Sequence, residues 1–133
     1  MTERGVETLA PASEACASAT AQLVGDTNYV VTYRQETSAV CAFDLTTRRV
    51  EDAVELPLGN GSWASTLLGD HDVFIGGYSP ARLYHLDTRD MSITEVADPE
   101  THKIHTVDTV PGEETVVFGT KPTQVVYEYD HDT

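Results

Sequence analysis

The chain has 133 residues, and 22 Asp and Glu against 8 Lys and Arg give it a formal net charge of −14. This length suits one domain with a buried core, and an apolar content of 40% is too high for a disordered acidic tail. The charge argues against nucleic acid and membrane surfaces as partners, because both are bound by basic faces. The sequence contains neither the long apolar run of a membrane span nor a signal peptide, and we expect a cytoplasmic protein.

A repeat of 43 residues organises the chain. Two columns of identical residues carry it, namely Val30, Val73 and Val116, and Asp44, Asp87 and Asp130. Between them lie runs of four to eight residues rich in Val, Ile, Phe, Tyr and Thr, which indicate strands. Four short strands in a repeat of this length predict an all-β protein made of β-propeller blades, each a four-stranded antiparallel sheet. We expect a single unit, 1–133, with repeats at about 12–56, 57–99 and 100–133.

The first predicted element is an outer strand in the segment 1–11, which completes a last sheet. Its Val6 and Leu9 match Ile93 and Val96 in the last strand of the middle repeat. The middle repeat gives the clearest strands, which are bounded by Gly, Pro or Asp. They are predicted at Ser62–Leu68, Asp72–Tyr78, Ala81–Asp87 and Ser92–Ala97. We expect the recurrent aspartate after each third strand to accept Asx-type hydrogen bonds from backbone amides.

The chain has two cysteines, Cys16 and Cys41, without a Cys-x-x-Cys spacing. Two isolated thiols make a poor metal site and do not form a disulfide framework. We expect both to be small buried hydrophobic residues in a reduced protein.

The segment VFIGGYSPARLYHLDTRDMSITEV and its echo VVFGTKPTQVVYEYD resemble blades of bacterial and archaeal β-propeller proteins of the pyrroloquinoline-quinone type and related repeats. The resemblance spans nearly the whole chain. It implies a propeller fold but transfers no catalytic residue, because the matching positions are structural. The sequence lacks the Gly-His and Trp-Asp pairs of strict WD40 repeats. Its many acidic residues and only two lysines are similar to the composition of proteins from salt-adapted archaea.

Three blades are too few for a propeller, which closes with four to eight. Two solutions remain open. Two chains can assemble head to tail into a six-bladed ring, in which each N-terminal strand completes the last blade of the neighbour. Alternatively, the sequence is a fragment of a longer propeller. We favour the homodimeric ring.

The candidate ligand site lies on the face formed by the loops between second and third strands and between repeats, where propellers commonly bind ligands. Trp63 is the only tryptophan and could stack on a sugar or another small polar ligand. The residues predicted on this face are Arg34, Asn60, Trp63, Tyr78, His102, Lys103, His105 and Lys121. The alternative is that Trp63 packs between blades and the other residues are solvated.

No catalytic residue, cofactor or metal site is predicted. His102 and His105 would point to opposite faces of a strand, and His131–Asp132 is interpreted as a turn. Cys41 lies inside a strand, and the sequence has no Gly-x-Ser-x-Gly motif. We therefore expect a non-catalytic binding or assembly module that presents its loop face to a small polar ligand, a glycan or a protein. The alternatives are a lyase- or lactonase-like enzyme with a site in the central channel, and a truncated fragment.

Overall fold

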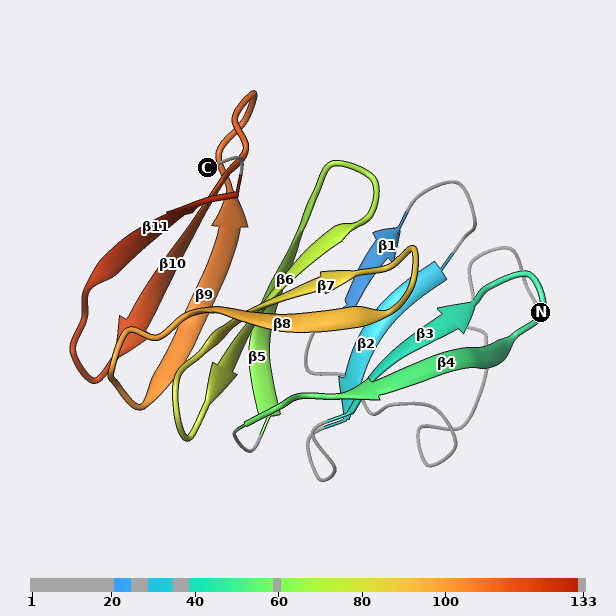
Figure 1. Cartoon of the computed structure of the whole chain (residues 1–133), viewed down its shortest axis with the longest axis horizontal. Helices are drawn as coiled ribbons and strands as arrows, with labels where there is room; N and C mark the ends of the chain where they lie inside the picture. Colours follow the sequence, from blue (N-terminus) through green and yellow to red (C-terminus); the bar gives the residue numbers. More distant parts are fainter. Residues whose placement is uncertain (1–20, 25–28, 35–38, 59–60, 132–133) are drawn as a thin grey trace, which may run out of the picture.

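A computed structural model describes residues 21–24, 29–34, 39–58 and 61–131, and these residues form eleven strands and no helix. Figure 1 shows β9 to β11 at one end, β5 to β8 in the middle and β1 to β4 at the other end. The strands are β1 (Ala21–Val24), β2 (Tyr29–Arg34), β3 (Ala39–Asp44), β4 (Arg49–Glu55), β5 (Gly61–Leu68), β6 (Asp72–Tyr78), β7 (Leu83–Asp87), β8 (Ser92–Ala97), β9 (Lys103–Thr109), β10 (Thr115–Lys121) and β11 (Val126–Asp130). The all-β prediction is confirmed.

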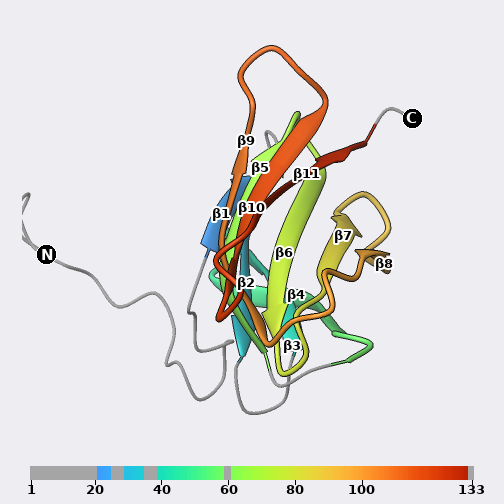
Figure 2. The ribbon, with the colours of Figure 1, turned by 90° about the vertical axis from the view of Figure 1, so that its left-hand side faces the viewer.

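Antiparallel neighbours group these strands into three repeat units. Unit 1 is the sheet β1-β2-β3-β4, unit 2 pairs β5, β6, β7 and β8 in sequence order, and unit 3 pairs β9, β10 and β11. Units 2 and 3 join at a single pair, Tyr78 and Lys103. Figure 2 shows the inner strands β1, β5 and β9 on one side of the molecule and β8 on the other.

The strands of unit 2 agree closely with the sequence prediction. β6 and β8 have the predicted bounds, and β5 begins one residue earlier, at Gly61. β7 begins at Leu83, later than predicted, because the backbone turns there and the Gly77 N–H donates to the Arg82 carbonyl at 2.8 Å. The predicted outer strand in 1–11 lies outside the described residues.

Two of the three recurrent aspartates, Asp44 and Asp87, have the predicted role in turns. Asp44 Oδ1 accepts the N–H groups of Thr46 and Thr47 at 2.7 and 3.3 Å. Asp87 Oδ1 accepts the N–H of Arg89 at 3.0 Å. Each aspartate thus closes the turn into the next strand, which explains why this residue recurs with the period of the repeat.

Two hydrophobic clusters fill the spaces between neighbouring units. The cluster between units 1 and 2 consists of Val24, Val40, Leu56, Val73, Ile75, Tyr84 and Leu86. The cluster between units 2 and 3 consists of Leu68, Phe74, Ala81, Leu83, Ile104, Val116 and Phe118. The approach at the second interface is close, because a Cβ atom on Gly76 would collide with the side chains of Ile104 and Val107. Packing between units therefore depends on a glycine at this position.

The prediction for the cysteines is partly wrong. Cys41 is buried, as expected, but it takes part in a disulfide rather than being a free thiol. The other cysteine, Cys16, lies outside the described residues. Sequence spacing does not indicate which Cβ atoms face each other in the fold, and this geometry decides whether a disulfide forms. Within the described part of the chain, no helix is long and apolar enough to cross a membrane.

Candidate functional site

Two lysines meet at the end of the sheets where β6 and β10 end and β9 begins, which we call the loop face (the lower edge in Figure 1), and the loop that leads into β9 carries Asp98 and Glu100. Lys103 and Lys121 are the only two lysines of the chain, and they lie directly opposite each other on β9 and β10. Lys103 is also the partner of Tyr78 at the end of β6. Like charges on opposite residues of a sheet destabilise it, and the pair is unusual in a chain of net charge −14.

An aromatic surface adjoins the two lysines. Trp63 on β5 stacks on Tyr78 with ring centroids 5.5 Å apart and an interplanar angle of 24°. The register of β5 against β6 shifts at this point, which leaves Trp63 as an extra residue. Trp63 is 46% exposed, so it does not pack within an interface between described units. The arrangement places this aromatic pair at the strand end whose register partner is Lys103.

The other predicted site residues divide into two groups. The His102 carbonyl accepts the Ser79 N–H at 2.7 Å, which fixes His102 beside Tyr78 on the loop face. His105 lines a shallow hollow of about 250 Å³ on unit 3, which Lys121 and Val126 also line. Arg34 is the last residue of β2, and its side chain is outside what the structure describes, as is all of Asn60.

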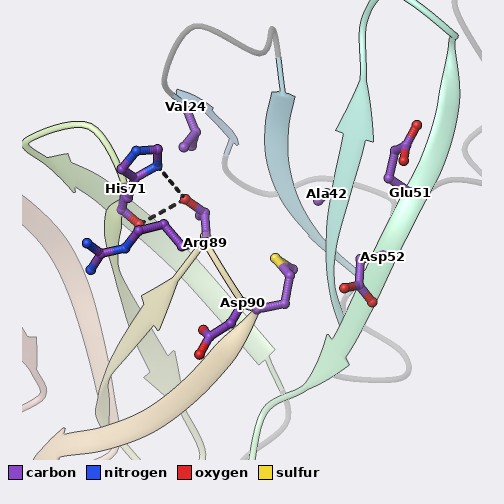
Figure 3. Close-up of a pocket in the computed structure, with 9 residues that line it drawn as sticks. Val24, Ala42, Glu51, Asp52, His71, Arg89 and Asp90 are labelled. Carbon is purple, nitrogen blue, oxygen red and sulfur yellow. Dashed lines mark hydrogen bonds between the residues drawn. The ribbon is translucent and has the colours of Figure 1, made fainter.

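A cavity of about 390 Å³ opens between units 1 and 2 (Figure 3). It is at the end of the sheets opposite the loop face, because its unit 2 residues come from the turns β5–β6 and β7–β8. Unit 1 contributes Val24, Ala42, Glu51 and Asp52, and unit 2 contributes His71, Thr88, Arg89, Asp90 and Met91. The Thr88 hydroxyl donates to the His71 carbonyl at 3.0 Å and joins the two turns.

Arg89 is the one arginine among the residues lining this cavity, and Asp87 fixes it. The Arg89 Nε and Nη2 atoms donate to the two carboxylate oxygens of Asp87, both at 2.8 Å. These hydrogen bonds from Arg89 lower the pKa of Asp87 to about 2 and raise the pKa of Arg89. Hydrogen bonds from Ser92 likewise lower the pKa of Asp90. The cavity wall on unit 2 therefore carries fixed, ionised groups.

A third group of polar side chains converges between units 2 and 3. Asp72 begins β6, His85 lies on β7, and His131 follows β11. His85 Nε2 lies 2.7 Å from Asp72 Oδ1, and His131 Nε2 lies 3.8 Å from the same oxygen. The side chains of all three are only 17% to 25% exposed. We call these three residues the Asp–His cluster.

Sequence comparison finds no matching protein family and no matching curated protein. Solved structures match in shape. The WD40 repeats of RRP9 superpose with a TM-score of 0.76 over 89% of this chain and 36% of theirs, at 6% identity. The β-propeller domain of Cps50 (Swd1) from Myceliophteria thermophila gives 0.66 over 84% and 39%, at 11% identity. The dihydro-heme d1 dehydrogenase NirN gives 0.65 over 84% and 25%, at 22% identity.

The fold is that of a β-propeller. At these identities the likeness concerns the fold alone, and the chain spans between 25% and 39% of the length of the three propellers.

The candidate ligand site predicted from the sequence was assigned to the loop face. The Asp–His cluster was not predicted. The repeat register contains a signal for the cluster, because His85 corresponds to Ala42 and His131 to Thr88 one repeat earlier. Two small or uncharged residues in one interface are thus replaced by two histidines in the next. Asp72 gives no such signal on its own, since its proximity to both histidines depends on how units 2 and 3 pack.

Proposed function

We propose that this chain is a non-catalytic binding and assembly module of the β-propeller type. In this proposal unit 3 docks against further propeller blades, and the loop face binds a small polar ligand that carries an anionic group. The glycines near the ends of β6 and β10, Gly76 and Gly119, also support repeats related to pyrroloquinoline-quinone-type blades.

The observation that carries the assembly proposal is the contrast between Leu83 and Val126, which are equivalent in the repeat. Leu83 on β7 is completely buried against unit 3, whereas Val126 on β11 is 76% exposed. Phe74 is likewise fully buried, and its equivalent in unit 3, Val117, is only partly buried. Unit 3 thus has an apolar docking face that no other described residue covers.

We propose that a second copy of this chain occupies the docking face, head to tail, and closes a six-bladed ring. Among the described residues, no strand pairs with the outer edge of β11. The N-terminal segment 1–11 of the partner would supply this strand. Such an arrangement covers both an apolar face and an unpaired strand edge, which are otherwise sites of non-specific association.

The mass in solution tests the ring. Light scattering at low and high salt should give about 29 kDa, twice the 14.5 kDa of one chain. A Val126→Asp variant should shift the mass to that of the monomer, because it places a charge in the centre of the docking face. Thr94→Asp is a matched control, since Thr94 is an exposed residue on β8 of unit 2, and units 1 and 3 of the same chain flank this unit. A wild-type mass near 14.5 kDa, with cooperative unfolding, would refute the ring.

The lysine pair beside the stacked Trp63 and Tyr78 supports the binding part of the proposal. An acidic sugar fits this chemistry, because its ring can stack on the aromatic face while its carboxylate accepts hydrogen bonds from the ammonium groups. A neutral sugar would satisfy only the aromatic half of the site. The proposal therefore predicts that the ligand must be anionic.

Fluorescence of Trp63, the only tryptophan, reports on this site directly. Titration with an oligogalacturonate should give a saturable change, and a neutral oligosaccharide of equal length should give none. Lys103→Gln and Lys121→Gln should each weaken binding about ten-fold, in proportion to one lost charge-assisted hydrogen bond. Arg49→Gln, which removes an exposed cation from unit 1, should have no effect. Binding that is insensitive to both lysines would contradict the proposed site.

A further inference from the structure

We propose that Asp72, His85 and His131, the Asp–His cluster, form a binding site for one divalent transition-metal ion of the zinc class. This site is independent of the loop face and lies between units 2 and 3. Neither the assembly proposal nor the ligand proposal requires it.

The ligand set suits such an ion. Two imidazoles and one carboxylate are typical ligands of zinc and of related first-row metals, and three protein ligands leave one coordination position open. One ligand atom from each residue lies within 4.8 Å of the other two. In a tetrahedral site with bonds of about 2.1 Å, ligand atoms are roughly 3.4 Å apart. Shifts of about an ångström in the side chains would therefore close the site around an ion.

Aromatic packing holds the two imidazole rings in place. Phe74, which is completely buried, stacks on His85 with centroids 5.0 Å apart and meets His131 edge-on at 5.2 Å. The two imidazole centroids are 4.6 Å apart. The Nδ1 atom of His131 is buried and has no hydrogen-bond partner among the described residues, so Nε2 carries the ring's polar contact with Asp72. The orientation of the rings is thus set before any ion binds.

A simple Asp–His ion pair would account for Asp72 and His85 but not for His131. Burying the His131 imidazole near the same carboxylate oxygen has a desolvation cost. An ion pair between Asp72 and His85 does not offset this cost. The equivalent interface between units 1 and 2 needs no such cluster, because Ala42 and Thr88 occupy the histidine positions there. The cluster is therefore a feature of one interface and not a requirement of the repeat.

Arg89 is the cationic group that faces the site, and its position is compatible with a metal ion. Its Nη2 atom lies 3.9 Å from Asp72 Oδ1. The same guanidinium binds both carboxylate oxygens of Asp87, which compensates its charge. Arg89 is also 62% exposed in its side chain, so solvent screens the remaining repulsion.

Binding of Co²⁺ to the full chain, first treated with a chelator, tests the site. We expect one equivalent to bind with the strong visible absorption of a four-coordinate ion, and Zn²⁺ to displace it. His85→Gln and His131→Gln should each weaken binding at least ten-fold. His71→Gln, in the neighbouring interface, and His105→Gln, on unit 3, are controls that should leave binding unchanged.

A thermal unfolding series provides the second readout. Zn²⁺ should raise the melting temperature of the wild type and of both control variants by mass action, and should not raise that of Asp72→Asn. If a histidine variant fails to fold, the stoichiometry of Co²⁺ binding to the wild type and its visible spectrum still test whether the site exists. Absence of a stoichiometric four-coordinate spectrum, or equal affinity in the controls and the cluster variants, would overturn the assignment.

Discussion

The two interfaces between repeat units have the same framework and different contents. At the interface of units 1 and 2, Ala42 and Thr88 line a cavity of about 390 Å³. At the interface of units 2 and 3, His85 and His131 occupy the equivalent positions, and their rings pack on Phe74. The backbone is conserved between the two, since the Thr88 N–H donates to the His71 carbonyl at 3.0 Å and the His131 N–H donates to the Glu114 carbonyl at 2.8 Å.

This difference shows how a repeat protein can acquire a specific site. Hydrogen bonds between turns keep each unit in register, so side chains at the interface can change without changing the fold. One interface can then retain a cavity while the next one gathers three metal-binding side chains. Substitutions at equivalent positions should consequently have unequal effects.

The largest difference is expected for Phe74→Ala. Phe74 is completely buried and contacts the rings of His85, Tyr129 and His131, so its loss should lower the free energy of unfolding by about 3–5 kcal/mol. In a single chain with no partner on unit 3, the equivalent change Val117→Ala should lower it by about 1 kcal/mol, because Val117 is only partly buried there. Urea denaturation of both variants measures the difference, and equal losses would show that the two faces are packed alike.

A smaller effect of opposite sign is expected for Ala42→Val. Ala42 is buried and lines the cavity between units 1 and 2, so two added methyl groups have space to occupy. Filling the cavity should raise the free energy of unfolding by about 0.5–1 kcal/mol. Leu83→Ile is the control. Leu83 lies on β7, the strand of unit 2 that is equivalent to β3, and it packs in the cluster between units 2 and 3. This substitution should be neutral or destabilising. A loss of stability in Ala42→Val would mean that the cavity does not accept side chains.

The sequence allowed much of this comparison to be predicted, because the 43-residue register assigns each residue a strand and a face. It located β6 and β8 correctly, identified Asp44 and Asp87 as turn residues, and grouped Trp63 with Tyr78, whose rings stack. These features depend on contacts within a unit or at its loops, where sequence spacing and strand alternation determine geometry.

Features that depend on contacts between distant segments could not be predicted in this way. Asp72, His85 and His131 come from three strand ends in two units, and their separation depends on how closely the units pack at Gly76. The disulfide of Cys41 similarly depends on a Cβ position that no local pattern encodes. The order of the residues along the chain does not by itself indicate either contact.

A further effect, comparable in size to that of Ala42→Val, concerns the group that contacts both interfaces. Arg89 lines the cavity and lies 3.9 Å from Asp72 of the Asp–His cluster, and Asp87 holds it there. Because hydrogen bonds from Arg89 lower the pKa of Asp87 from its ordinary 3.8 to about 2, the ionised form stabilises the folded state. This stabilisation is present above pH 3.8 and is lost as the pH falls through about 2.

Solvent screening limits the stabilisation, since the Arg89 side chain is 62% exposed, and we expect Asp87→Asn to lower the free energy of unfolding by about 1 kcal/mol at pH 7. Asp44→Asn is the matched control, because the Asp44 carboxylate accepts the backbone N–H groups of Thr46 and Thr47 in the equivalent turn of unit 1. Urea denaturation of wild type and both variants between pH 7 and pH 2 separates the two aspartates. The deficit of Asp87→Asn should shrink toward pH 2, whereas a deficit that is constant over this range would exclude the Arg89 ion pair as its cause.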